Sequence, residues 1–199
     1  MKAIIIPGWL VLLLSSVLLI SSCRKGENDP AFTLLGRKAR IKGDWKLTEG
    51  KVEITYANPE KDDFDTYFSF DGSNFTLKYM DSTQTSFSGT YSLKLSFIKE
   101  GEFSMDESLG ASRFMARGDW QFVLKSGEYK NKERIEIRTD EVSVGSTYYF
   151  HPLLIERNRA VFNIRELRKN RLVLTYVGQP FLSEDGTGVN YLCELIFDR

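Results

Sequence analysis

The sequence predicts an all-β domain, an antiparallel barrel of about 8–10 strands that follows a short N-terminal helical turn. Apolar and polar residues alternate in short runs from Gly43 onward, as in strands that have one buried face. Residues that favour turns separate these runs, and no long helical period follows Ile41. A sandwich would also fit the pattern, but a barrel leaves no strand edge unpaired.

The alternating runs define the expected strands. In chain order they contain Trp45 and Leu47, then Val52 to Tyr56, Phe64 to Phe70, Phe75 to Tyr79, Tyr91 to Phe97, Trp120 to Leu124, Ile135 and Ile137, Tyr148 to Ile155, Phe162 and Ile164, Leu172 to Tyr176, and Tyr191 to Phe197. Aromatic and β-branched residues are frequent in these runs, as strands prefer.

Three turns between the runs are well marked. Asp71-Gly72 stands between two alternating runs and predicts a hairpin, which Ser73 and Asn74 would lengthen. Lys99-Glu100-Gly101 predicts a second hairpin, and a charged turn spans Arg168 to Arg171.

A short motif occurs twice, in KGDWKLT at residues 42–48 and in RGDWQFV at 117–123. We expect Gly43 and Gly118 to stand at strand starts, where glycine lets the backbone bend or approach a neighbour closely. Trp45 and Trp120, two residues later, are expected to point into the barrel and fill one end of it.

The first 22 residues have the features of a secretory signal peptide. Lys2 precedes an apolar stretch from Ala3 to Ile20, and small residues follow it. A retained transmembrane helix is the alternative. At 18 residues the stretch is at the short limit for spanning a bilayer, and Pro7 is unfavourable in a helix interior.

The stretch Leu19-Ile20-Ser21-Ser22-Cys23 resembles the lipobox of bacterial lipoproteins. That resemblance implies cleavage before Cys23, a thioether-linked lipid on Cys23, and acylation of the new N-terminus with a fatty acid such as palmitate. The expected location is the outer membrane, by default on its periplasmic side, with the cell surface as the alternative. Two or more acyl chains hold a protein firmly on a membrane.

Residues 23–41 are expected to form a lipidated tether and a short lead-in helix, and residues 42–199 the barrel domain. Arg37, Lys38 and Arg40 form a small basic cluster in the lead-in. This cluster is either a solvated face or a contact with lipid headgroups beside the anchor. Basic and acidic residues balance at 27 each, so no basic excess predicts nucleic-acid binding.

Gly43-Asp44-Trp45 resembles the Gly-x-Trp signature on the first strand of lipocalins. The whole plan is similar to the lipocalin-like lipoproteins of Bacteroidota, through the segments RKARIKGDW, FSFDGSNFTL, SGTYSLKLSF, GDWQFVLKSGEYKNKERIEI and NIRELRKNRLVLTY. The resemblance implies a barrel and names no ligand. Thr139-Asp140-Glu141 partly matches the second lipocalin signature, and Arg199 is the candidate for the arginine that packs over the first tryptophan.

The sequence does not predict an enzyme or a bound cofactor. His151 is the one histidine, and a catalytic zinc normally takes three protein ligands. No Gly-x-Ser-x-Gly motif and no phosphate-binding loop is present. A pair of carboxylates could still meet in space, as in glycosidases. Cys193 lies in an apolar run, where a buried structural thiol is expected.

Three short motifs match modification or adhesion signals. Arg117-Gly118-Asp119 matches an integrin-binding tripeptide, but its neighbour Trp120 favours a role in the barrel. Asn74-Phe75-Thr76 matches an N-glycan acceptor, a signal that usually has no reader in bacteria. Asp81-Ser82-Thr83 resembles the O-glycosylation motif of exported Bacteroidota proteins, which makes Ser82 a candidate site.

Two functions fit the sequence. In the first, the lipid-anchored barrel binds a small hydrophobic ligand, lined by Phe68, Phe70, Phe75 and Tyr91. These aromatic residues could instead simply fill the core. In the second, the barrel is a non-enzymatic structural scaffold that docks to an envelope assembly. Leu192 and Ile196 make the second face of the last strand apolar and favour a covered outer surface, with either another protein or the N-terminal turn as the cover.

Overall fold

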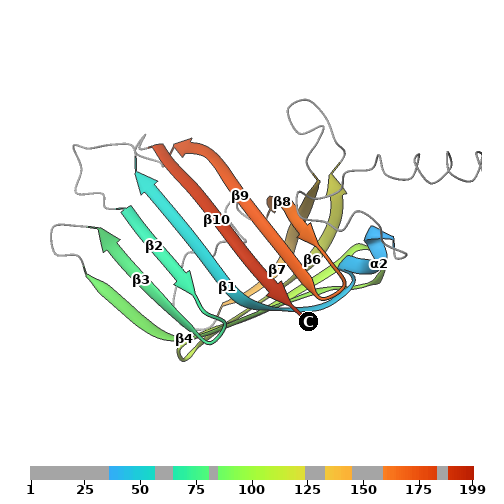
Figure 1. The fold of residues 1–199 in the computed structure, drawn as a ribbon, viewed down its shortest axis with the longest axis horizontal. Helices are drawn as coiled ribbons and strands as arrows, with labels where there is room; N and C mark the ends of the chain where they lie inside the picture. Colours follow the sequence, from blue (N-terminus) through green and yellow to red (C-terminus); the bar gives the residue numbers. More distant parts are fainter. Residues whose placement is uncertain (1–35, 57–64, 81–84, 124–132, 145–158, 183–187) are drawn as a thin grey trace, which may run out of the picture.

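The computed structural model describes residues 36–56, 65–80, 85–123, 133–144, 159–182 and 188–199. These residues form a closed antiparallel β-barrel with one α-helix before it (Figure 1). The elements are α2 (Arg37–Ile41), β1 (Gly43–Tyr56), β2 (Asp65–Phe70), β3 (Asn74–Met80), β4 (Ser86–Phe97), η2 (Lys99–Gly101), β5 (Glu102–Leu109), β6 (Ser112–Val123), β7 (Arg134–Val144), β8 (Arg159–Leu167), β9 (Arg171–Leu182) and β10 (Gly188–Asp198). The predicted all-β barrel is thereby confirmed.

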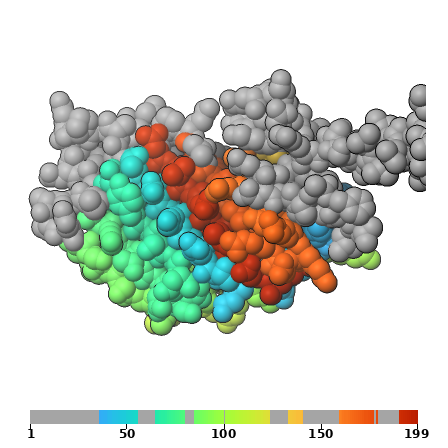
Figure 2. Space-filling view, in the orientation of Figure 1, coloured from blue at the N-terminus to red at the C-terminus, as the bar shows by residue number. Residues whose placement is uncertain are grey.

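Each strand pairs with its neighbours in sequence, and β10 pairs with β1 to close the ring. Figure 1 shows β1 and β10 side by side along most of their length, with β9 beside β10. In the space-filling view, β3, β2, β1, β10 and β9 form one continuous outer surface (Figure 2). This up-and-down order places sequence neighbours next to each other and needs no long crossover.

The ring changes its strand number along the barrel, because β1 has two partners on one side. Residues Gly43–Lys46 pair with β4, whereas Gly50–Ile54 pair with β2. A shift in the register of β1 against β10 between Leu47 and Glu49 marks the change. The described residues thus form a ten-strand ring at one end, and an eight-strand ring at the other, where β2 and β3 are absent and β1 pairs directly with β4.

The turn between β2 and β3 sits at the fork between β1 and β4. Gly72 has φ of 86°, and an added Cβ there would lie 2.9 Å from the Thr48 carbonyl oxygen. The Tyr91 amide donates a 2.8 Å hydrogen bond to the Ser73 carbonyl. The Asp71 carboxylate accepts hydrogen bonds from the amides of Asn74 and Ser73, which lower its pKa. The predicted hairpin is confirmed, with a turn of Asp71, Gly72 and Ser73 between the strands.

Helix α2 and the C-terminal residue close the eight-strand end. The Trp45 indole is fully buried and donates a 2.7 Å hydrogen bond to the Ile41 carbonyl. The Arg199 guanidinium lies 4.3 Å from the centre of the Trp45 ring and donates to the carbonyls of Arg40 and Lys42. The geometry confirms Arg199 as the arginine that packs over the first tryptophan.

The two Gly-Asp-Trp stretches serve this end of the barrel in different ways. Trp120 is buried like Trp45 and also donates to a backbone carbonyl, that of Ile98, at 3.4 Å. Gly43 begins β1 with φ of 122°. The expectation that Gly118 begins a strand is wrong, because it lies inside β6 where the register to β7 shifts. An added Cβ on Gly118 would be 1.9 Å from the Arg138 carbonyl, so its role is close backbone approach.

Two strand assignments differ from the sequence prediction. The runs at Trp45–Leu47 and Val52–Tyr56 belong to the single strand β1, which bulges between them. Strand β5 was not expected, because the buried Glu107 interrupts the apolar set formed by Phe103 and Met105. An acidic residue at an inward position hides the period of two.

Some sequence predictions fall outside the described residues. They are the signal peptide, Cys23 with the tether and lead-in up to residue 35, the candidate glycosylation site Ser82, and the Tyr148 to Ile155 run with His151.

Candidate functional site in the ten-strand end of the barrel

The four aromatic residues predicted to line a ligand site lie together on the inner face. Phe70 stands opposite Phe75 across β2 and β3. The Phe70 ring is 6.2 Å from Phe68 and 4.4 Å from Tyr91, measured between ring centres. The register of three neighbouring strands therefore gathers these side chains into one cluster.

Two glycines make room for this cluster. An added Cβ on Gly50 would lie 2.9 Å from a ring carbon of Phe70, and one on Gly89 would lie 2.8 Å from a ring carbon of Phe75. Gly50, Phe70, Phe75 and Gly89 are successive partners across β1 to β4. The row thus places the two phenylalanines side by side between two glycines, and each ring lies over the backbone of the neighbouring glycine.

Along β4, the exposure of the inward residues rises from Tyr91 at the fork to Phe87 near the rim of the barrel. Phe70 is 4% exposed, whereas Phe87, at an inward position of β4, is 53% exposed. Leu77 of β3 joins them, since it stands opposite both Phe68 and Phe87. The Tyr79 ring meets Phe87 edge-on at 6.0 Å. The inserted strands therefore present an apolar surface that the described residues cover only in part.

A buried polar pair lies at the inner end of this surface. Glu107 is 1% exposed, and the Tyr91 hydroxyl donates a 2.5 Å hydrogen bond to its Oε1. Glu107 stands opposite Leu93 and Phe114, in the same inward row as Phe103 and Met105. A buried carboxyl group is costly unless it is hydrogen-bonded, and the Tyr91 hydroxyl supplies one such bond.

The sequence did not single out Glu107 or Phe87. Glu107 resembles an ordinary solvent-facing acid, because its inward direction follows only from the register of β5 against β4. The signal available was its place in the alternation after Phe103 and Met105. Phe87 was separable from core residues only by its exposure, which tertiary structure decides.

Cys193 lies on the inner face of β10 and is buried. Burial raises the pKa of its thiol to about 12, so it stays protonated at neutral pH. The structure agrees with the expected buried structural thiol and gives no nucleophile at this position.

The outer face carries an open groove of about 600 Å³ over β1, β4, β5 and β6. The Lys94 ammonium lies 2.6 Å from Asp44, and Arg113 holds Asp106 with two hydrogen bonds of 3.0 and 2.7 Å. These contacts lower the pKa of both aspartates. Each carboxylate is thus paired with a basic side chain of a neighbouring strand. Cross-strand charge pairing therefore accounts for these charged residues of the groove.

The inner surface offers binding chemistry. It consists mainly of apolar rings, and the buried pair of Tyr91 and Glu107 adds a hydrogen-bonding group beneath them. Within the described residues, no group of histidine, cysteine and acidic side chains could hold a metal ion. In the same part of the chain, none of the helices has the length and apolar character needed to cross a membrane.

No known protein family and no curated protein matches this sequence significantly.

Proposed function

We propose that this protein is a lipid-anchored envelope lipoprotein whose barrel binds a small, mainly apolar ligand in its ten-strand end. Cys23 would carry the lipid, as its lipobox-like context implies. The ligand would lie against Phe68, Phe75 and Phe87 and direct a polar group towards Tyr91 and Glu107. The observation that carries this proposal is the partly exposed apolar inner face above a buried carboxylate.

The alternative role, a scaffold subunit of an envelope assembly, has one supporting observation. Leu192 on the outer face of β10 is 46% exposed, and Ile196, further along the same face, is half-buried. Single exposed apolar side chains are common on protein surfaces, so this observation is weaker than the inner-face cluster.

The first test is native mass spectrometry on the full mature protein, extracted from its own membrane in mild detergent. We expect an intact mass that includes acyl groups on Cys23, and an additional small molecule that is released on unfolding. A protein without this additional mass that also fails to bind a neutral apolar fluorophore, N-phenyl-1-naphthylamine, would contradict ligand binding. An unmodified Cys23 would contradict lipid anchoring.

A pair of variants locates the site. Phe87→Ser should weaken fluorophore binding roughly tenfold, because it removes an apolar contact from the rim of the inner face. Met115→Ser is the matched control, since Met115 is an exposed apolar side chain on β6 that lies outside this cluster. Both side chains are exposed, so both variants should fold, which circular dichroism checks. Equal affinities of the two variants would place the fluorophore elsewhere.

A further inference from the structure

The eight-strand end carries a group of basic residues from three segments that are far apart in sequence. We call it the basic end; its members are Lys38, Lys42, Arg168, Lys169, Arg171 and Arg199. Helix α2 is tied to the β8–β9 turn, because Arg40 donates to the Leu167 carbonyl. Arg199 joins both segments, since its side chain donates to the Lys42 carbonyl and its amide donates to that of Asn170.

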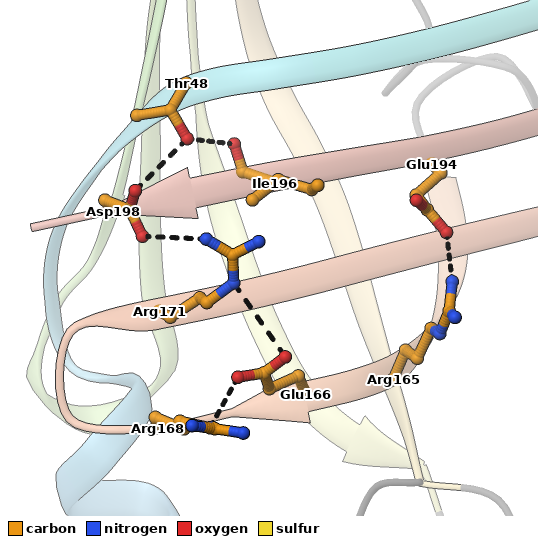
Figure 3. Close-up of polar contacts among 8 residues, drawn as sticks. All are labelled: Thr48, Arg165, Glu166, Arg168, Arg171, Glu194, Ile196 and Asp198. Atoms are coloured by element: carbon orange, nitrogen blue, oxygen red, sulfur yellow. Dashed lines mark hydrogen bonds and ion pairs between the residues drawn. The ribbon is translucent and has the colours of Figure 1, made fainter. Parts of the chain in front are cut away.

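The acidic residues near the basic end do not cancel its positive charge. Glu166 is buried, and Arg168 lies 2.5 Å from it, with Arg171 at 3.8 Å (Figure 3). Arg171 also lies 3.8 Å from Asp198, which is half-buried. Glu133 is buried as well and pairs with Arg37, outside the basic end. Glu133 and Glu166 thus lie beneath the cations, whereas Asp198 is about as exposed as Arg171. The exposed Asp44 beside Lys42 pairs with Lys94. The six basic residues outnumber these acidic neighbours.

The lysines of the basic end differ from its arginines in their contacts with the rest of the protein. Lys38 and Lys169 are exposed, and Lys42 is half-buried. No ion pair with another described residue involves any of these three lysines. Their charges are therefore available to an external partner, whereas Arg168, Arg171 and Arg199 also hold the end of the barrel together.

The N-terminal segment that leads from Cys23 enters the domain beside the basic end, which favours a membrane as its partner. The described residues begin at Gly36, the N-cap of α2, which lies at this end. Residues 24–35 connect it to Cys23, and a chain of that length cannot span more than about 45 Å. If Cys23 carries lipid, this tether joins the domain at its eight-strand end and keeps that end within about 45 Å of the bilayer.

We propose that the basic end docks onto anionic lipid headgroups, so that the ten-strand end faces away from the membrane. This inference rests on the proposed lipid anchoring of Cys23. Each basic side chain close to an anionic membrane strengthens its binding about fivefold, and salt screens the effect. An acyl anchor and a basic patch act together as two signals. The orientation leaves the partly exposed inner face accessible from the aqueous side.

The test is lysine footprinting of the full lipidated protein reconstituted into vesicles. One vesicle preparation is phosphatidylcholine alone, and the other contains a third phosphatidylglycerol. A membrane-impermeant amine-acetylating reagent is applied, and peptide mass spectrometry measures the labelling rates. We expect Lys38, Lys42 and Lys169 to react about fivefold or more slowly on the anionic vesicles, and 0.5 M salt to remove the difference. Lys78 of β3 and Lys51 of β1, both exposed, should react equally on both vesicles.

A charge variant checks that the protection comes from the basic end. In Lys38→Glu, Lys169→Glu protein, the protection of Lys42 should fall, whereas the matched variant Lys51→Glu, Lys78→Glu should keep it. Equal labelling of the three lysines on both vesicles, by protein that floats with them, would overturn the headgroup contact alone. Protein that floats with neither vesicle would lack the anchor, which would overturn both the anchoring and this orientation.

Discussion

Arg199 shows how a single residue closes one end of the barrel. Its guanidinium covers the Trp45 ring at 4.3 Å and donates a 2.6 Å hydrogen bond to the Arg40 carbonyl. It also covers Gly43, where an added Cβ would lie 3.3 Å from its Nη2. The residue thereby connects the last strand with α2 and with the start of the first strand.

We expect Arg199→Ala to lower the free energy of unfolding by about 2 kcal/mol, because it removes a cation–π contact and charged hydrogen bonds to backbone. Thermal unfolding should shift by roughly 4–8 °C for a domain of this size. The matched control is Arg165→Ala, which removes an exposed pair with Glu194 and should change stability by less than about 1 kcal/mol (Figure 3). Equal shifts for the two variants would contradict the closing role of Arg199.

At the scale of strands, the pairing of β6 with β7 depends on the absence of one side chain. The Gly118 backbone lies so close to β7 that a Cβ would lie 1.9 Å from the Arg138 carbonyl and 2.8 Å from the Thr139 Cα. The register of the two strands shifts at the same place, between Arg117 and Gly118. Because the facing atoms are backbone atoms, they cannot move away as a flexible side chain would.

Gly118→Ala should therefore destabilise the protein by about 3 kcal/mol or more, through displacement of β7 from β6. Denaturant unfolding followed by tryptophan fluorescence would measure the change, since Trp120 is two residues away. The control is Gly36→Ala, where nothing lies within 4 Å of the added Cβ and φ is −61°. A change of under 1 kcal/mol for Gly118→Ala would rule out the close approach.

The outer face of the same strands carries a network of hydrogen bonds and ion pairs, centred on the buried Glu136 of β7. Burial acts to raise the pKa of Glu136, but hydrogen bonds from Gln121, Arg138 and Arg159 outweigh it and lower the pKa overall. These donors come from three neighbouring strands, β6, β7 and β8. The network therefore holds the strands together only while the carboxylate is ionised.

This network predicts a loss of stability in acid. The folded pKa of Glu136 lies below its unfolded value, so its contribution is fully present above about pH 4.5 and is lost as pH falls through the folded pKa. Glu136→Gln should be less stable than the wild type at pH 7, and the two should converge towards pH 3. Urea unfolding at several pH values measures this. Parallel pH profiles for the two proteins would show that Glu136 titrates equally in both states.

For the whole molecule, the change from eight to ten strands separates a packed end from a more open one. Several of the largest fully buried side chains lie at the eight-strand end, among them Trp45, Phe97 and Phe197. The β2–β3 hairpin has inner residues that are only half-buried, such as Phe68 and Leu77. Local opening should be easier where fewer apolar contacts must be broken.

We therefore expect amide hydrogen exchange to be at least tenfold faster in residues 65–80 than in Leu172–Tyr176 and Tyr191–Phe197. Ligand binding at the inner face should slow exchange selectively in residues 65–80, because a bound state must release its ligand before it opens. Uniform protection around the ring would contradict a separate, more open end.

The fold was predictable because the period of two is a local signal. The alternation of Leu93, Leu95 and Phe97 indicates an inward strand face without information from any other strand. The dipeptide Asp71-Gly72 likewise indicates a turn from its own residue types. The candidate site was predictable only in part. Phe68, Phe70, Phe75 and Tyr91 were found as inward aromatics, whereas Glu107 was missed because a charged residue at an inward position contradicts the pattern.

By itself the sequence determined the class of the fold, most of the strands, the tryptophans of the closed end and the expectation of a lipidated N-terminus, because alternation, turn residues and short motifs are encoded by neighbouring residues. Only the tertiary structure showed that β1 pairs with β4 at one end and with β2 at the other, and that the Gly118 backbone packs against the Arg138 carbonyl. It also showed that basic residues from three distant segments lie at the same end of the barrel. These features depend on the register between strands and on contacts across more than a hundred residues, as between Arg199 and Arg40. No local pattern records such distances, since they follow from how the closed ring is paired.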